Sequence, residues 1–457
     1  MRAQRSVLII SAAAATLLAG CLLVIGVILP ESAAPNDHVV RPGSAQTQQQ
    51  DPATDLSHFV LRPATNQRQL GRRAAELTRH LRTSGVHHVL STASRQASGR
   101  AGGPCNERSL PKSVTIKRSI CFDPEDSGLG THPQWTPQGV TTVADAQPSQ
   151  RWRGGGPAQP IIVSWYNGLP NRRLDRRQGT RISVLNPATG AYEHVLLVYP
   201  TADGSYMSMR QRQLPSSGSL HAGGIVWYGN YLYVADVNRG FRIFDLRQIL
   251  DLKASRNGNT TDTEKIGRIG KTYYGHGYRY VLPESAAYSN TSSSARACTT
   301  AATGPIFSYV GLDRTGADHL TSGEYCTARA DPVSGRVATW PLDASTGKPK
   351  LTGRYWKGDS AYHLPQDKGS FQGALRWRGR WYLSHSSGGH RSGSFYTTDR
   401  IRSRTGTLSI DRARTRRLSI GPEDLSHWGG TSPFSGVWTV SEYRRKRMLY
   451  NIGEPDG

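Results

Sequence analysis

Polar and small side chains recur at the openings of several short segments that are rich in aromatic and β-branched residues. Each opening has two informative positions. The first is occupied by Gln138, Gly223, Glu284, Gln372 and Glu423, and the second by Gly139, Gly224, Ser285, Gly373 and Asp424. Carboxylates and amides are unusual where a buried strand should be apolar, so these openings are candidates for one shared site.

Two kinds of chemistry fit these residue types. Carboxylate and amide oxygens around an axis could hold Ca²⁺, which accepts about six to eight oxygen ligands; no other metal is indicated. Glu284 and Glu423 could instead be the acid and base of glycoside hydrolysis, where the separation of two carboxyl groups sets the stereochemical outcome. The structural alternative is a solvated channel lining with small residues where strands crowd together.

His221 precedes the first position of its opening by two residues. An imidazole can act as ligand, proton carrier or hydrogen-bond donor, and its charge responds to small changes in its surroundings. Because Gly223 and Gly224 leave room beside it, we expect His221 at the channel mouth, within reach of Gln138, Gln372 or Glu423. The alternative is a histidine that caps the preceding turn and faces solvent.

The segment 221–246 shows which elements must position these residues. Three runs of aromatic and β-branched residues are separated by turn signals at Gly229-Asn230 and at 238–240. Such spacing predicts three antiparallel strands of a meander, with a tight hairpin at the first turn.

Partial copies of this pattern recur at irregular intervals. Gly223–Val226 resembles Gln372–Leu375, and Leu232–Val234 resembles Trp381–Leu383. Small sheets of this kind bury their faces by stacking around an axis, so the repeats predict an all-β, five-bladed β-propeller. Six or seven blades stay open, because 192–220 and 251–280 could hold further strands. An all-β sandwich is the alternative.

The segment Gln372–Gly388 resembles a motif of five-bladed glycosidases, in which a glutamate precedes a small residue and a strand ending in Tyr-Tyr-Leu. Gln372 stands where the catalytic acid of those enzymes would be. A carboxamide cannot donate a proton as that acid does. The resemblance therefore supports the propeller and argues against that particular mechanism.

From about residue 105 onward, the chain also resembles uncharacterised secreted β-propeller proteins of high-GC Gram-positive bacteria. The residues that carry this resemblance are Thr136–Val140, Tyr192–Pro200, His221–Gly224, Leu232–Asp236 and Gly421–Leu425. It implies export and a propeller, and it implies no known activity.

The N-terminal part predicts export. Residues 1–29 combine Arg2 and Arg5 with an apolar run, which is typical of a signal peptide or an uncleaved membrane anchor. Leu18–Cys21 resembles a lipoprotein box, a third alternative. Residues 30–104 are expected to be a disordered linker with one amphipathic helix over 72–90, interrupted near Gly85, and residues 105–457 to be the propeller.

Four cysteines follow the apolar run, and an even number in an exported chain predicts disulfides. Nearest-neighbour pairing joins Cys105 to Cys121 and Cys298 to Cys326. Zinc binding is the rival interpretation, but no Cys-x-x-Cys spacing supports it.

The chain carries 57 basic and 33 acidic residues, a net charge of +24. This excess attracts polyanions such as cell-wall polymers or anionic lipids, although it is also typical of high-GC codon usage. No nucleotide-binding or nucleophile-elbow motif is present, and nothing indicates specific nucleic-acid binding. The leading hypothesis is a monomeric, secreted or membrane-anchored extracellular propeller that binds a glycan or polyanion. The alternative is a secreted, glycosidase-like hydrolase with its site at the channel mouth.

Overall fold

The computed structural model describes residues 54–112, 114–129, 135–152, 159–168, 179–213, 217–290, 298–299, 302–327, 333–366 and 368–455. The predicted N-terminal signal or anchor and the first part of the predicted linker lie outside these ranges. No helix in the described ranges is long and apolar enough to cross a membrane.

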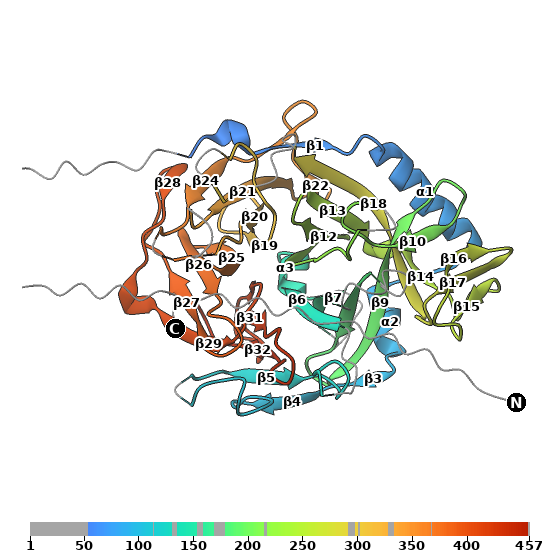
Figure 1. The fold of residues 1–457 in the computed structure, drawn as a ribbon, viewed down its shortest axis with the longest axis horizontal. Helices are drawn as coiled ribbons and strands as arrows, with labels where there is room; N and C mark the ends of the chain where they lie inside the picture. The colour runs from blue at the N-terminus through green and yellow to red at the C-terminus, as the bar shows by residue number, and fades with distance from the viewer. Residues whose placement is uncertain are drawn as a thin grey trace, which may run out of the picture. The chain divides into compact units, whose positions relative to one another are not determined.

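The described chain is all-β, and its strands form five successive antiparallel meanders around a common centre (Figure 1). The first meander contains β6 (Trp135–Thr142), β7 (Ile161–Asn167), β8 (Thr180–Leu185) and β9 (Ala191–Pro200). The second contains β11 (Ile225–Tyr228), β12 (Tyr231–Asp236), β13 (Gly240–Asp245) and β18 (Tyr280–Asn290). This arrangement of small radial sheets is a β-propeller.

The third meander contains β19 (Tyr309–Asp313), β20 (His319–Gly323), β21 (Arg336–Asp343) and β24 (Ser360–His363), with β28 (Thr405–Thr407) at its outer edge. The fourth contains β25 (Phe371–Trp377), β26 (Arg380–His385), β27 (Ser392–Thr397) and β29 (Arg416–Ile420). The fifth contains β30 (Ser426–Trp428), β31 (Gly436–Val440) and β32 (Leu449–Asn451). It is completed by β5 (Arg118–Cys121) and β4 (Ser98–Ala101), so the N-terminal part of the chain closes the ring.

The hairpin predicted at Gly229-Asn230 is confirmed. Tyr228 pairs with Tyr231 across the turn, and Gly229 has a φ of +59°, which glycine adopts without steric cost. The third opening, however, was wrongly placed at Glu284. That residue lies in β18, which pairs with β13 as the outer strand of the second meander, and the third meander begins at β19.

The segment 251–280, which could have held a sixth blade, does contain strands, but they form no additional blade. β14 (Ile249–Asp251) pairs with β18, while β15 (Gly258–Asn259), β16 (Ile266–Ile269) and β17 (Thr272–Gly275) form a small separate sheet. β18 then runs parallel to β9 through Tyr280–Pro283, which joins the first two meanders into one sheet.

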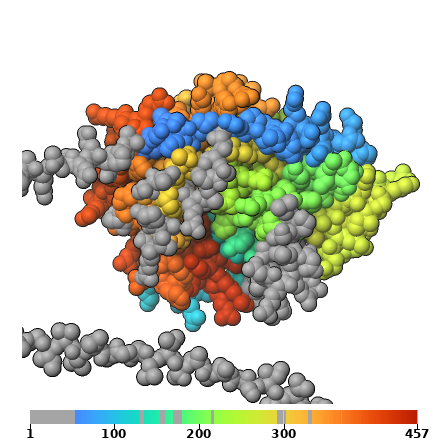
Figure 2. Space-filling model, turned by 45° about the horizontal axis from the view of Figure 1, so that its top comes forward, coloured from blue at the N-terminus to red at the C-terminus, as the bar shows by residue number. Residues whose placement is uncertain are grey.

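Residues 54–104 pack on the propeller rather than forming a linker, so the compact unit begins before the predicted boundary at residue 105. β1 (Val60–Pro63) pairs with β18 and with β23 (Trp356–Lys357), and α1 (Gln67–His80) packs against β18. The helix predicted over 72–90 is two helices, α1 and α2 (Val86–Ser91), separated by β2 (Arg82–Ser84). Figure 2 shows this blue segment lying across the sheets.

The short elements that remain lie at the edges of these sheets. They are β3 (Arg95–Gln96), β10 (Tyr206–Ser208), β22 (Lys348–Pro349) and α3 (Val143–Ala146), with 3-10 turns at Leu56–His58, Leu246–Gln248 and Arg412–Arg414.

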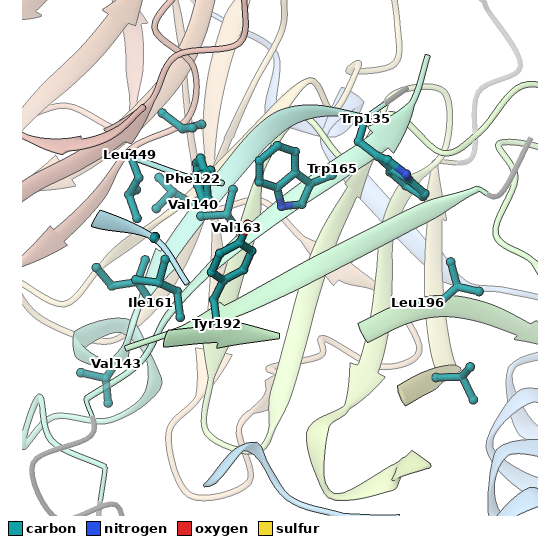
Figure 3. Packing of buried hydrophobic residues seen from close by; sticks show 14 of the residues in the cluster. Phe122, Trp135, Val140, Val143, Ile161, Val163, Trp165, Tyr192, Leu196 and Leu449 are labelled. Carbon is teal, nitrogen blue, oxygen red and sulfur yellow. The ribbon is translucent and has the colours of Figure 1, made fainter. Parts of the chain in front are cut away.

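A fully buried tryptophan anchors each meander. They are Trp165, Trp227, Trp340, Trp381 and Trp438. Between the first and fifth sheets, the rings of Phe122 and Trp165 meet edge-on, with their centroids 4.8 Å apart. Val140, Val163 and Leu449 belong to the same buried cluster (Figure 3). Burial of such large apolar side chains supplies the main driving force that holds neighbouring sheets together.

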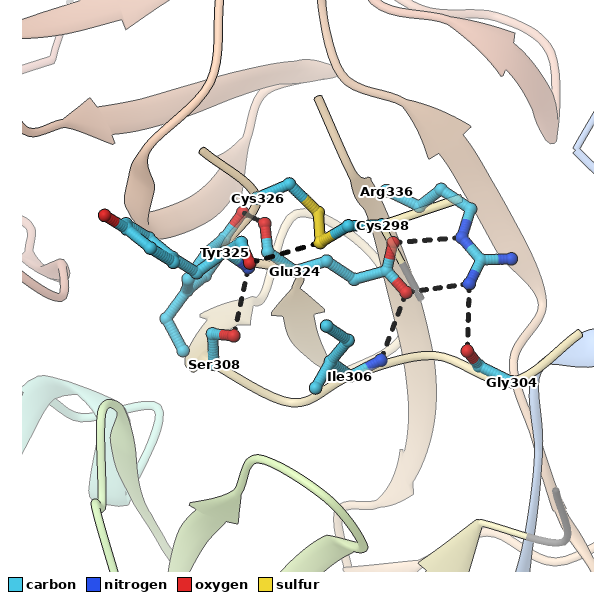
Figure 4. The surroundings of a disulfide bond; sticks show 9 residues. Cys298, Gly304, Ile306, Ser308, Glu324, Tyr325, Cys326 and Arg336 are labelled. Atoms are coloured by element: carbon cyan, nitrogen blue, oxygen red, sulfur yellow. Dashed lines mark hydrogen bonds and ion pairs between the residues drawn. A yellow bond between two sulfur atoms is a disulfide. The ribbon is translucent and has the colours of Figure 1, made fainter. Parts of the chain in front are cut away.

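Both predicted disulfides are confirmed, Cys105–Cys121 and Cys298–Cys326. Two disulfides indicate an oxidising environment. Cys326 follows Glu324, whose buried carboxylate forms a two-armed ion pair with Arg336 at 2.8 and 3.0 Å (Figure 4). The second disulfide therefore lies beside a buried charge pair that joins the segment after β20 to the start of β21.

Candidate functional site

Four glycines and one aspartate bring the innermost strands into backbone contact, a set that we call the inner ring. Its members are Gly139, Gly224, Gly311, Gly373 and Asp424. A Cβ atom at any of the four glycines would lie within 3.0 Å of backbone atoms of the next inner strand. The sequence placed four of these five correctly, and Gly311 takes the place predicted for Ser285. The strands crowd the axis here, as the structural alternative proposed.

Asp424 completes the inner ring with its side chain. The backbone N–H groups of Ile225 and Val140 donate to its Oδ2 at 3.1 and 3.3 Å. Burial raises the pKa of Asp424 well above its ordinary range. Asp424 thereby ties together the fifth, first and second meanders, and its role is structural.

A carboxyl cluster lies on the side of the inner ring where the inner strands begin. It consists of Gln138, Gln372, Glu423 and Glu442. The Gln372 amide donates to Glu423 Oε1 at 3.0 Å, and the Gln138 amide donates to Glu442 Oε2 at 3.2 Å. The two carboxyl groups hydrogen-bond directly to each other. Three of the four residues were expected at the mouth, and the structure brings those three together.

The surroundings of the two glutamates raise both of their pKa values, that of Glu423 more strongly. Burial, followed by the charge of Glu442, raises the pKa of Glu423 well above its ordinary value. Burial also raises the pKa of Glu442, but hydrogen bonds from Gln138, Tyr443 and Glu423 oppose the shift. Two adjacent carboxylates repel each other when both are ionised, so this arrangement favours a proton on Glu423 rather than on Glu442.

Sequence reasoning missed Glu442. It lies two residues after the last residue of β31 and at no opening of a repeat, so alignment of the openings did not select it. In the structure β31 ends at Val440, and Glu442 lies in the connection to β32, partly exposed. The available signal was Ser-Glu-Tyr followed by basic residues, which is a poor continuation for a buried strand.

His221 packs against Tyr166, whose pKa reports the charges of this cluster. The two rings stack in a tilted arrangement with centroids 4.7 Å apart. The charges of Glu442 and Glu423 contribute to the raised pKa of Tyr166. Burial lowers the pKa of His221 to about 4, so its imidazole is neutral at physiological pH. The described contacts include no hydrogen bond from His221 to Gln138, Gln372 or Glu423, and its direct reach to them stays a prediction.

Glu284 lies away from the mouth, so its pairing with Glu423 as acid and base was wrong. Its carboxylate is fully buried and accepts a hydrogen bond from Arg242 at 3.0 Å, and Arg242 also binds Asp236. Glu284 is thus held in a buried ion pair within the second meander and does not face Glu423.

A serine and a histidine of the first meander lie in series with an aspartate from the segment between β5 and β6. Ser183 Oγ is 2.9 Å from His194 Nδ1, and His194 Nε2 is 3.1 Å from Asp126 Oδ2. Ser183 is fully buried and accepts a hydrogen bond from Trp165. A nucleophile must reach its substrate, so this series is a core hydrogen-bond network.

Within the described ranges, no group of three or more His, Cys, Asp or Glu residues is placed to hold a metal ion. Backbone N–H groups donate to Asp424 Oδ2, so this oxygen is already occupied by hydrogen-bond donors and is a poor ligand for a cation. Calcium at the channel mouth stays a prediction from the sequence.

No family model and no curated protein matches the chain. Among solved structures, the chain is similar to the GH43_1 enzyme from Xanthomonas citri, with 10% identity, a TM-score of 0.31, and coverage of 83% of this chain and 92% of that one. A thermostable family-43 glycoside hydrolase gives 8% identity, a TM-score of 0.34 and coverage of 69% and 88%. A putative oxidoreductase (glucose dehydrogenase) from Thermus thermophilus gives 11% identity, a TM-score of 0.29 and coverage of 78% and 99%. Likenesses this distant carry no argument about activity.

Proposed function

We propose that the protein is a secreted, five-bladed propeller that hydrolyses glycosidic bonds at the mouth containing the carboxyl cluster. The observation that carries the proposal is the hydrogen-bonded pair Glu423 and Glu442, in which Glu423 is buried and Glu442 is partly exposed. Paired titratable groups whose surroundings assign them opposite protonation states are the usual basis of acid–base catalysis.

Each glutamate has a distinct role in this proposal. Glu423, whose pKa is raised by burial and by the charge of Glu442, donates its proton to the leaving oxygen of the glycosidic bond. Glu442, ionised and partly exposed, acts as the base or nucleophile on the opposite side. Gln372 occupies the position of the acid in the motif that it resembles, and its amide here holds Glu423 Oε1, leaving Oε2 to carry the proton.

Substrate binding must separate the two carboxyl groups. Retaining glycosidases place them about 5–5.5 Å apart and inverting ones about 6.5–9.5 Å apart. Glu423 and Glu442 are hydrogen-bonded to each other, which leaves no room for a sugar between them. Since Glu442 lies in a connection outside β31, it is the partner that moves, and a sugar hydroxyl replaces its hydrogen bond to Glu423.

A glycan substrate is favoured by the aromatic side chains around the cluster. Tyr166 and Tyr443 are partly exposed, and Tyr325 is 36% exposed. Aromatic faces pack against the apolar faces of sugar rings, while carboxyl and amide groups bind hydroxyls. Secretion, with the disulfides that an oxidising compartment permits, gives access to such polymers.

The close contact of the two carboxyl groups also favours a second candidate, a glycan-binding propeller without catalysis. In that case Glu423 and Glu442 would remain hydrogen-bonded when the ligand is bound, and the cluster would act only as a hydrogen-bonding surface. The basic charge of the chain would then add attraction to anionic polymers.

Substitution of each glutamate separates the two candidates. We expect the wild type to release reducing sugar from a panel of plant and cell-wall polysaccharides, and both Glu423→Gln and Glu442→Gln to be at least about 100-fold slower. Glu442→Gln should retain polysaccharide binding in a pull-down. The exposed Glu107→Gln serves as the matched control and should leave both measurements unchanged.

The wild type could instead be retained on polysaccharide without releasing any sugar, and Glu442→Gln could weaken that retention. This outcome would refute hydrolysis and support the glycan-binding candidate. The absence of both release and retention over the whole panel would refute a role in glycan chemistry.

A further inference from the structure

A second recess lies on the opposite side of the inner ring, where the inner strands end. Its volume is about 650 Å³, within the range of about 300–1,000 Å³ found for small-molecule sites. We call it the arginine pocket, because Arg314, Arg376 and Arg378 line it together with Trp377 and His427. These residues lie at or just after the ends of β19, β25 and β30, so the fold gathers them from three different sheets.

Arg314 has donors that no described residue accepts. Its Nη2 donates to the Asp145 carbonyl at 2.6 Å, and its guanidinium lies over the Tyr228 ring at 5.0 Å. Its Nε and Nη1 atoms are buried and have no hydrogen-bond partner among the described residues. Leaving charged donors unsatisfied in a buried position is costly, so an acceptor brought by a ligand would be bound strongly.

The other charged groups facing the pocket leave it positive. Asp313 lies 3.6 Å from Arg376 Nε, and Glu454 is bound to His427 at 3.0 Å. The Asp145 carboxyl group accepts from Ser426 and Thr141, and its pKa is raised by burial. Arg378 stacks over Trp377 at 4.2 Å and has no acidic partner among the described contacts. The positive charges of Arg314 and Arg378 are therefore not balanced by acidic groups among the described residues that face the pocket.

The geometry points to an anion site in the arginine pocket, which takes a carboxylate or phosphate group carried on a sugar-sized molecule. Guanidinium groups bind both oxyanions through charge-assisted hydrogen bonds. Trp377 and His427, whose rings are 4.9 Å apart, supply an aromatic wall for the rest of the ligand. The site is independent of the proposed glycosidase activity, because the inner ring separates it from the carboxyl cluster.

Calorimetry at low salt with four probes tests the site: inorganic phosphate, glucuronate, glucose 1-phosphate and neutral glucose. We expect saturable binding of the organic anions and none of glucose, with affinity falling as salt rises. Glucuronate bound more tightly than the phosphate probes would identify a carboxylate ligand, and the reverse order a phosphate ligand. Arg314→Gln should weaken binding about ten-fold or more.

Arg378→Gln is a second pocket variant, needed in case Arg314→Gln misfolds. Arg378 is exposed and stacks on a single ring, so its substitution should not disturb the fold. It should fold normally and also weaken binding. The exposed Arg72→Gln on α1 is the matched control and should bind as the wild type does. Glucose bound as well as the anions, no saturation by any anion below about 10 mM, or unchanged binding in both pocket variants would overturn the site.

Discussion

Glu423 couples the stability of the fold to pH. Its pKa in the folded protein is raised above the ordinary value of 4.5, so the native state keeps a proton that the unfolded chain releases. The stabilisation is complete below the ordinary pKa and is lost as pH rises towards the raised pKa. Each such proton changes the free energy of unfolding by up to about 1.4 kcal/mol per pH unit.

Glu423→Gln removes this titration. Wild type loses stability between pH 5 and pH 8, and the variant does not. We therefore expect the free energy of unfolding of the variant minus that of wild type to be larger at pH 8 than at pH 5, by about 1 kcal/mol or more. Urea unfolding at the two pH values measures the difference. Glu107→Gln, an exposed substitution of the same type, should show no comparable change. An equal effect of Glu423→Gln at both pH values would mean that Glu423 is ionised in the native state.

At the residue scale, the sequence predicted the positions that repeat and missed those that do not. Gln372 and Glu423 open equivalent strands, so alignment of the repeats placed them together correctly. Glu442 joins them from a connection between strands, and its partner Gln138 is 304 residues away in the chain. Contacts between non-equivalent positions depend on how the sheets pack, which periodicity does not encode.

At the scale of elements, Gly224 sets the approach of β11 to β19. A Cβ atom there would clash with the backbone of Tyr309 and Val310. We expect Gly224→Ala to lower the free energy of unfolding by about 1–3 kcal/mol, because two inner strands would have to move apart. Gly316→Ala is the control, as its Cβ would meet nothing within 4 Å, and it should be neutral within about 0.5 kcal/mol. Equal stability of both variants in thermal unfolding would contradict this account of the inner ring.

The misplaced third opening has an equally local cause. Pro283-Glu284-Ser285-Ala286 has the residue types of an opening, but β18 is reached only after the excursion through β14–β17. The fourth strand of the second meander thus arrives late in the chain and pairs with β13 and β9 at once. Nothing in the local pattern distinguishes such a returning outer strand from the first strand of the next sheet.

At the scale of the whole molecule, closure of the ring depends on β5, which pairs with β32 from the other end of the chain. Cys105–Cys121 attaches the end of β5 to the preceding loop across 16 residues. We expect Cys105→Ala with Cys121→Ala to lower the free energy of unfolding by about 2–4 kcal/mol. Hydrogen exchange of amides 118–121 should accelerate at the same time.

The matching variant Cys298→Ala with Cys326→Ala is the comparison. It should lose stability without faster exchange in 118–121, since its disulfide lies beside the third meander. Equal acceleration at β5 in both variants would show that closure does not depend on the first disulfide.

The contact between inner strands has a further consequence for any polymer that meets this protein. Four glycine backbones and the Asp424 side chain bring neighbouring inner strands into contact around the axis. Contacts this close would hinder the threading of a long saccharide from one end of the described propeller to the other. Under the proposed function, such a polymer would present a terminus or an exposed side branch to the carboxyl cluster, and each released fragment would leave on the side from which the polymer came.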